Sequence, residues 1–321
     1  MVFDDPTSRR ALLKGVTWAG ALGIYAFVTK KLTLAASCVA FGVGTVTVAA
    51  GPAPHAALLV FFLSSTKITK FGADVKRRID RSYGEHSTRS VSQVICNSLP
   101  AVLVVMLGSH HMGTFGGWWS FPASECARVA AVAHFAACQG DTWSSEIGVL
   151  SQSPPRLILG WRQVPRGTNG AVSLLGLVAS AAGGLLVGLS SGLAHHFFSH
   201  SDLHQQQVRV GRRREGTVES IAVYVAVGVL AAVAGSVIDS VLGQLLQRSI
   251  LSRDGHSVLT PEEAQLEETA GSTHGGEKVG TPTAPRAVAI TGTANILNND
   301  SVNLVSSTLV TLAAYLWAGW E

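Results

Sequence analysis

Charged residues are scarce in this sequence. Lys, Arg, Asp and Glu make up 14% of the 321 residues, whereas hydrophobic residues make up 47%. A soluble domain usually carries about 25% charged residues. The shortage excludes an ordinary soluble protein and predicts a polytopic membrane protein, in which apolar spans joined by loops form one bundle.

The sequence also lacks the motifs of common soluble enzymes. It has no Gly-x-x-x-x-Gly-Lys-Ser/Thr phosphate loop, no Gly-x-Ser-x-Gly nucleophile turn and no His-Glu-x-x-His zinc motif. The four cysteines have no pairwise metal-binding spacing. These absences exclude soluble nucleotide-binding and hydrolase folds.

The positive charge of the chain is weak and local. A formal net charge of +4 would suggest nucleic-acid binding in a soluble protein. Here Lys and Arg cluster in loops between apolar runs, where membrane orientation and anionic headgroups explain them. We therefore expect membrane lipids, and no nucleic acid, as partners.

Eight apolar runs predict an all-α bundle of about eight transmembrane helices, with the third run the shortest. The runs lie at about 11–29, 32–50, 55–66, 91–108, 123–140, 171–194, 218–243 and 302–320. Residues 252–285 are rich in Ser, Gly, Thr, Glu and Pro, which predicts a long disordered loop. This loop is an insertion within a single membrane domain of residues 1–321.

The loops alternate between two faces of the predicted bundle. Lys30–Lys31 and residues 67–90, 141–170 and 244–301 fall on one face and carry most of the Lys and Arg. We expect that face to be cytosolic, or stromal in a plastid. The organelle stays open between the endoplasmic reticulum and the plastid envelope, and the 195–217 loop, rich in His and Arg, falls on the other face.

A dense polar stretch separates the fifth and sixth apolar runs. Residues 139–148 read Gln-Gly-Asp-Thr-Trp-Ser-Ser-Glu-Ile-Gly, and residues 164–170 read Val-Pro-Arg-Gly-Thr-Asn-Gly. Glycines let the backbone approach a ligand, hydroxyls bind oxyanions, and carboxylates at phosphate sites usually hold a divalent metal. The stretch predicts a phosphate and metal site at a membrane edge.

Three carboxylates are the candidate metal ligands. Asp141 ends the fifth run, and Glu146 follows five residues later. The two could share a metal if a loop intervenes, or lie on adjacent faces if the helix continues. Asp239 lies inside an apolar run, where a carboxylate costs about 2.5–3.5 kcal/mol on insertion scales and marks a functional site. The alternative for Asp239 is a hydrogen bond that only holds helices together.

Hydroxyl and basic side chains alternate at the end of the third run. Lys67 and Lys70 are interleaved with Ser64, Ser65, Thr66 and Thr69. This mixture suits a polyphosphate or a lipid phosphate. The alternative is an ordinary basic loop. Asparagines before the last run, among them Asn299 and Asn303, either cap that helix or complete the polar site.

Together these motifs resemble the transmembrane protein 19 family of integral membrane proteins, which includes the plant phytyl-phosphate kinase of tocopherol synthesis. The resemblance runs from about residue 55 to the C-terminus and is carried by residues 61–70, 76–77, 140–148, 155–156, 164–170, 235–243 and 298–303. It implies transfer of a phosphoryl group from a nucleoside triphosphate, with CTP as the expected donor, to an isoprenyl or other lipid monophosphate.

Residue roles follow from the polar residues themselves, because phosphoryl transfer needs charge neutralisation and alignment more than covalent help. Catalytic roles go to Asp141, Lys67, Lys70, Arg156 and Arg166, phosphate binding to Ser144, Ser145, Thr168, Asn169, Asn299 and Asn303, and Mg²⁺ binding to Asp141, Glu146 and Asp239. The lipid tail would lie among the small residues of 171–194 and 218–243. A competing hypothesis is a transporter or lipid-binding protein without catalytic activity, for which internal repeat symmetry is expected and none is found. The oligomeric state stays open.

Overall fold

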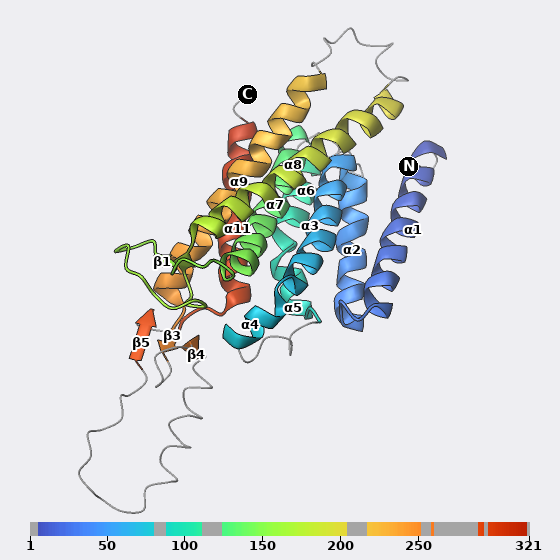
Figure 1. The fold of residues 1–321 in the computed structure, drawn as a ribbon. Coiled ribbons are helices and arrows are strands. Elements are labelled where there is room, and N and C mark those ends of the chain that lie inside the picture. The colour runs from blue at the N-terminus through green and yellow to red at the C-terminus, as the bar shows by residue number, and fades with distance from the viewer. Residues whose placement is uncertain are drawn as a thin grey trace, which may run out of the picture.

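The computed structural model describes residues 6–79, 88–110, 124–203, 217–251, 258–259, 288–291 and 295–319. Most of these residues form helices that run up and down beside one another (Figure 1). The helices are α1 (Pro6–Val28), α2 (Leu34–Ala50), α3 (Pro52–Lys70), α4 (Ala73–Ile79), α5 (Val91–Cys96), α6 (Leu99–His110), α7 (Glu125–Gly148), α8 (Leu174–Leu203), α9 (Thr217–Leu246) and α11 (Asn299–Ala318).

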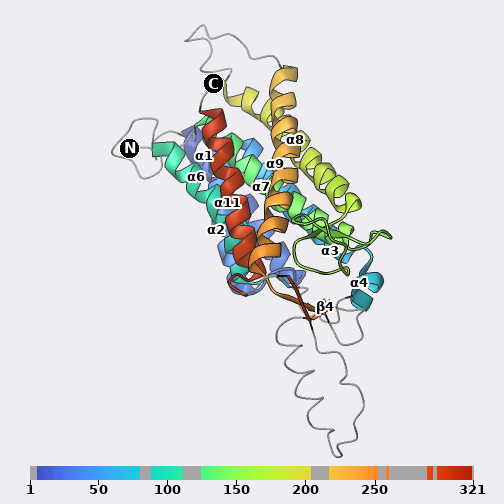
Figure 2. The same ribbon diagram turned by 90° about the vertical axis from the view of Figure 1, so that its left-hand side faces the viewer.

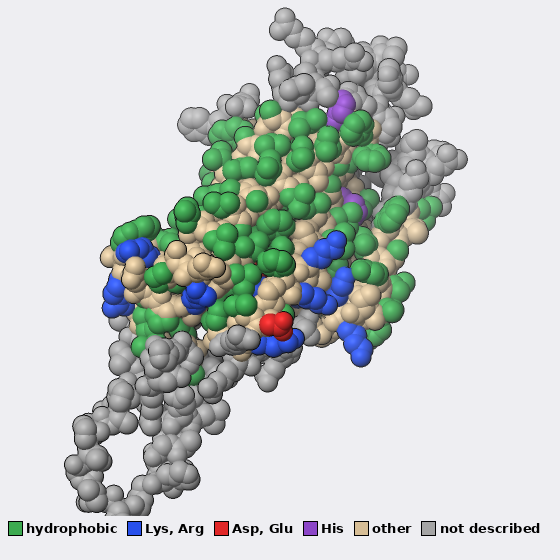
Figure 3. All heavy atoms as spheres, in the orientation of Figure 1, with side chains coloured by type: hydrophobic (Ala, Val, Ile, Leu, Met, Phe, Trp, Pro, Cys, Tyr) green, Lys and Arg blue, Asp and Glu red, His purple; other side chains and the backbone are tan. Residues whose placement is uncertain are grey.

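The outer faces of the bundle are apolar, as in a membrane protein. The segments Leu174–Phe198, Ile221–Leu246 and Asn299–Ala318 are long and apolar enough to cross a membrane. Large apolar side chains point outward, such as Leu230 with 70% of its surface exposed. Hydrophobic side chains are spread over the upper part of the bundle, whereas the described charged side chains gather lower down (Figure 3). The structure supports the helical membrane architecture, while the number of eight spans stays a prediction.

Helix α7 is the centre of the bundle. It packs against α3, α6, α8, α9 and α11, and every residue from 129 to 140 is buried. Helix α11 lies in front of α7, beside α9 and α6 (Figure 2). The predicted fifth run ends at 140, but α7 continues to Gly148, because neighbouring helices accommodate its polar residues.

Two helices differ from their predicted bounds for local reasons. Helix α3 extends beyond the predicted 55–66 to Lys70, because Ser64, Thr66 and Thr69 each donate a hydrogen bond to the carbonyl four residues earlier. The fourth run, predicted at 91–108, is divided into α5 and α6. The break comes just before Pro100, which lacks an N–H group and is tolerated in the first turn of a helix.

All the described strands lie at one end of the bundle, which we call the strand end (Figure 1). The antiparallel strands β1 (Arg156–Leu157) and β2 (Ala171–Val172) form one small sheet. The strands β4 (Val258–Leu259), β3 (Ser249–Leu251) and β5 (Val288–Thr291) form a second, in that order. The all-α prediction therefore needs these two small sheets added.

The strand end also contains α4 and the turn after α1 (Figure 1). The described parts of the loops predicted for one face thus lie together. Residues 252–285 are predicted to be disordered, but Val258 and Leu259 within them form strand β4. This apolar pair is ordered because it pairs with strand β3. Residues 252–257 and 260–285 lie outside the described residues, as does most of the 195–217 loop.

Glycines bring α8 and α9 into direct backbone contact. A Cβ atom added at Gly184 would lie 2.3 Å from the carbonyl oxygen of Gly228, and one added at Gly188 would lie 2.3 Å from that of Tyr224. Such distances leave no groove. The small residues at these positions are used for helix packing, so a lipid tail does not fit between α8 and α9 here. A lipid tail among the other small residues of these helices stays a prediction.

Replacing Gly228 with Ala is expected to lower the free energy of unfolding by about 1–3 kcal/mol, the usual cost of overpacking. A Cβ atom there would lie 2.4 Å from the carbonyl oxygen of Gly184. Gly42→Ala is the matched control, because nothing lies within 4 Å of its added Cβ. Thermal unfolding in detergent should show a lower midpoint for Gly228→Ala only. Equal midpoints would contradict the close contact.

Candidate functional site

Two carboxyl groups face each other where α7 and α9 cross near the strand end. Gly140 permits the approach of the helices, because a Cβ atom there would lie 2.6 Å from the Cβ of Ala232 on α9. The next residue of α7, Asp141, lies near enough to Asp239 of α9 for the two carboxyl groups to interact. Two carboxylates repel each other at this range unless a cation or a shared proton lies between them.

Helix α11 adds polar groups to this pair. The hydroxyl of Ser306 donates a hydrogen bond of 3.2 Å to Oδ2 of Asp239. Asn303 lies three residues earlier, so the two side chains share one face of the helix. The Asn303 Oδ1 atom is buried and has no hydrogen-bond partner within the described part of the chain. A buried amide oxygen without a donor is a suitable ligand for a hard cation. We call Asp141, Asp239, Asn303 and Ser306 the aspartate site.

Glu146 points away from the aspartate site. Because α7 stays helical, five residues rotate Glu146 by about 140° from Asp141. Its Oε2 atom lies 2.5 Å from Nζ of Lys76 on α4. Lys76 is buried, and it also donates to the carbonyl oxygens of Ile68 and Thr69 at the end of α3. The negative charge of Glu146 is thus balanced by a lysine that ties α4 to α3 and α7.

The predicted three-carboxylate metal site is therefore not assembled. Among the described residues, no group of three or more His, Cys, Asp or Glu side chains is close enough to hold one metal ion. The reason is that α7 stays helical through this stretch, so that Asp141 faces α9 and Glu146 faces α4. Two carboxylates nevertheless suffice for Mg²⁺, which usually keeps several waters and binds one or two carboxylates together with substrate phosphates.

The predicted lysines lie on the surface of the strand end. Lys67 and Lys70 are exposed in the last turn of α3. Both are close enough to Tyr25 of α1 to affect it electrostatically, and Lys31 donates to the same tyrosine hydroxyl. Lys and Arg side chains gather in this region (Figure 3). The lysine that reaches an acidic partner is Lys76, which belongs to the same basic stretch but had no predicted catalytic role.

The predicted arginines hold the loop between α7 and α8. Arg156 donates to the carbonyl oxygen of Trp161 at 2.8 Å, and its guanidinium lies over the ring of that residue. Arg166 donates to the carbonyl oxygen of Gln152 at 3.1 Å. In the described part of the chain, both arginines therefore contact carbonyl oxygens of their own loop, and their catalytic role stays a prediction.

Most of the predicted phosphate-binding residues also make local contacts. The Ser145 hydroxyl donates to the carbonyl oxygen of Asp141, and the Thr168 hydroxyl to that of Pro165. The backbone N–H of Asn169 donates to the Ser249 hydroxyl, and the Ser144 hydroxyl packs against Gly176. Asn299 is exposed at the start of α11. Of this set, Asn303 alone joins the aspartate site among the described residues.

Sequence reasoning missed polar residues that link α7 to its neighbours. The Gln139 side chain exchanges hydrogen bonds with the hydroxyls of Ser64 and Ser65 on α3. His134 contacts the Thr311 hydroxyl and the carbonyl oxygen of Asn97 at the break between α5 and α6. The available signal was a polar side chain in an otherwise apolar run, because such a group needs a partner inside a membrane protein.

Comparison with known proteins agrees with this architecture. Protein PGR from Arabidopsis thaliana is 34% identical over 304 residues, which cover 92% of each chain. An uncharacterized membrane protein from Methanocaldococcus jannaschii is 32% identical over 132 residues, which cover 41% of this chain and 49% of the relative. No solved structure matches. The family described as integral membrane protein DUF92 matches residues 17–311, and the chain therefore belongs to the DUF92 family of integral membrane proteins.

Proposed function

We propose that this protein is a membrane-embedded kinase for isoprenyl or other lipid monophosphates, with a nucleoside triphosphate, CTP first among them, as the phosphoryl donor. The observation that carries the proposal is the aspartate site at the strand end. It combines two facing carboxyl groups with a buried amide oxygen that has no donor among the described residues. The resemblance to the transmembrane protein 19 family supports the same reaction.

The residues of the aspartate site fit a magnesium ion. Asp141 and Asp239 would hold the cation, because it removes the repulsion between their charges. Asn303 would contribute its unpartnered oxygen, while Ser306 keeps the Asp239 carboxylate in place through its hydrogen bond. When bound, Mg²⁺ supplies neutralisation and alignment of phosphate oxygens, which is most of what phosphoryl transfer requires.

The reaction needs little covalent help from the protein. An oxygen of the lipid monophosphate attacks the γ-phosphorus, the bond from the γ-phosphorus to the bridging oxygen breaks, and a nucleoside diphosphate leaves with that electron pair. The attacking phosphate is already ionised at neutral pH, so no strong general base is required. The exposed Lys67 and Lys70 would attract the donor phosphates to this end of the bundle. By the positive-inside tendency, this end faces the cytosol or stroma.

The proposal is tested by offering the purified protein γ-labelled CTP, ATP, GTP or UTP together with phytyl, geranylgeranyl or longer polyprenyl monophosphates and Mg²⁺. We expect a labelled lipid diphosphate from at least one pair, and its formation should stop when EDTA removes the metal. A folded protein that labels none of the lipids would overturn the proposed activity.

A further inference from the structure

A narrow apolar cavity lies on the side of α3 that faces α1, α2 and α5. It has a volume of about 80 Å³. Its walls are mostly small and aliphatic side chains, among them Ala19 of α1, Ala40 of α2 and Leu58 of α3. A cavity of this size suits a short length of one hydrocarbon chain and offers little to a polar ligand.

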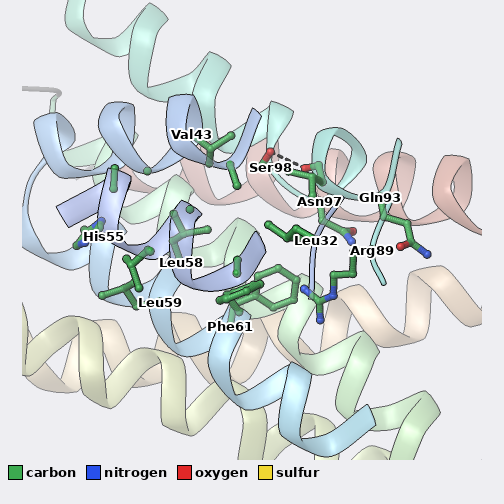
Figure 4. Close-up of a pocket in the computed structure, with 18 residues that line it drawn as sticks. Leu32, Val43, His55, Leu58, Leu59, Phe61, Arg89, Gln93, Asn97 and Ser98 are labelled. Carbon is green, nitrogen blue, oxygen red and sulfur yellow. Dashed lines mark hydrogen bonds between the residues drawn. The ribbon is translucent and has the colours of Figure 1, made fainter. Parts of the chain in front are cut away.

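One formal charge lies at this cavity. His55 lies towards one end and Arg89 towards the other (Figure 4), and Arg89 is the only Lys, Arg, Asp or Glu among its described lining residues. The backbone of Arg89 is fixed, because its N–H donates to the carbonyl oxygen of Lys31 at 3.0 Å. Burial lowers the pKa of Arg89, but an arginine keeps its proton at every physiological pH.

The guanidinium of Arg89 is held by aromatic rings and is available for a ligand. Its central carbon lies 5.5 Å from the ring centre of Phe61 and 5.8 Å from that of Phe62. Within the residues that the structure describes, this side chain has no hydrogen-bond acceptor. A partly buried guanidinium with unused N–H groups suits the bidentate binding of a phosphate.

The position of Arg89 relates the cavity to the aspartate site. Arg89 interacts electrostatically with Glu146 and Cys138 of α7, and these two residues bracket Asp141 in the sequence of that helix. A phosphate at Arg89 would therefore lie near the stretch of α7 that carries Asp141. An apolar chain attached to it would extend into the cavity.

We propose that this cavity binds the hydrocarbon chain of a single-chain lipid phosphate and that Arg89 binds its phosphate group. The inference rests on the proposed function and names the acceptor subsite of that reaction. Lipid phosphate is favoured over a neutral lipid, because a neutral lipid would leave the buried guanidinium N–H groups without a hydrogen-bond acceptor. Free phosphate is disfavoured, because it would leave the apolar walls without a ligand.

The test is calorimetric binding to purified wild-type protein in detergent, without nucleotide or metal. The probes are phytyl monophosphate, phytol and inorganic phosphate. We expect phytyl monophosphate to bind at least tenfold more tightly than either fragment. Arg89→Gln should weaken its binding about tenfold or more, with partial recovery in Arg89→Lys. Equal binding of phytyl monophosphate to wild type and both folded Arg89 variants would overturn the proposal.

The chain itself is tested by filling the cavity. Ala40→Phe should weaken the binding of both phytyl monophosphate and phytol by tenfold or more. Ala35→Phe is the matched control, because Ala35 lies on the same helix, is exposed and does not line the cavity. The two alanine variants still test the proposed lipid site if an Arg89 variant does not fold. Unchanged lipid binding in folded Ala40→Phe would place the chain elsewhere.

Binding and activity measurements together distinguish a failure of the proposed lipid site from a failure of the proposed kinase activity. Binding that depends on Arg89 and Ala40 but leads to no labelled diphosphate would retain the lipid site and reject the kinase. Labelled diphosphate with an unchanged KM for the lipid in both variants would retain the kinase and reject this subsite.

Discussion

Replacing Asp239 with Asn is expected to slow phosphoryl transfer by about 10²–10³-fold, the usual effect of removing one preorganised electrostatic group. Asn has the same shape and can still accept the hydrogen bond from Ser306. It lacks the charge that attracts a divalent cation. Asp141→Asn should have a similar effect, and the double variant should lose little more, because the two carboxylates act as one unit. The measurement is the rate of diphosphate formation at saturating Mg²⁺.

The same substitutions should leave the protein at least as stable. The carboxyl groups of Asp141 and Asp239 lie near enough to interact, so neutralising one removes a repulsion. Asp74→Asn serves as the control, because Asp74 is 91% exposed and lies on α4 beside Arg77. It should retain full activity. If Asp239→Asn kept its activity and only lost stability, the pair would be a structural contact between helices.

Replacing Lys76 with Met is expected to lower the free energy of unfolding by about 3–5 kcal/mol, as when one partner of a buried ion pair is removed. Lys76 is 3% and Glu146 is 21% exposed. The change leaves the Glu146 carboxylate without its counter-charge and removes the donor to two carbonyl oxygens at the end of α3. Denaturation in detergent, monitored by circular dichroism, measures the loss.

Two further variants test the origin of that loss. Lys76→Met combined with Glu146→Gln should recover most of the stability, because no buried charge is then left unpaired. Arg77→Met should cost about 1 kcal/mol or less, because Arg77 forms a pair with Asp74 that is exposed on both sides. A Lys76→Met variant as stable as Arg77→Met would contradict the proposed anchoring of α4.

Much of the helical layout follows from the sequence because apolar runs and prolines are local signals. Gly51 and Pro52 separate α2 from α3 as expected. The bounds of polar helices are harder to predict. Helix α7 passes the predicted end of its apolar run because its polar groups find partners on other helices, as Glu146 does with Lys76 of α4. Such partners are unknown before the fold is known.

The candidate site was predictable in part for the same reason. Asp141 and Asp239 each stand out as a carboxylate in or beside an apolar run, and burial makes that signal strong. The choice between Lys67, Lys70 and Lys76 has no such signal, since all lie in one basic stretch. The structure separates them by burial, because Lys76 alone of the three lies within the protein interior.

The most direct test is to reconstitute the protein in sealed liposomes and follow chemistry and lipid movement in the same sample. The liposomes contain phytyl monophosphate, and γ-labelled CTP and Mg²⁺ are supplied on both sides. We predict labelled phytyl diphosphate from the wild-type protein and about 10²–10³-fold less from Asp239→Asn. Movement of phytyl monophosphate between leaflets that requires Asp239, with no labelled diphosphate, would contradict the kinase and identify a transporter.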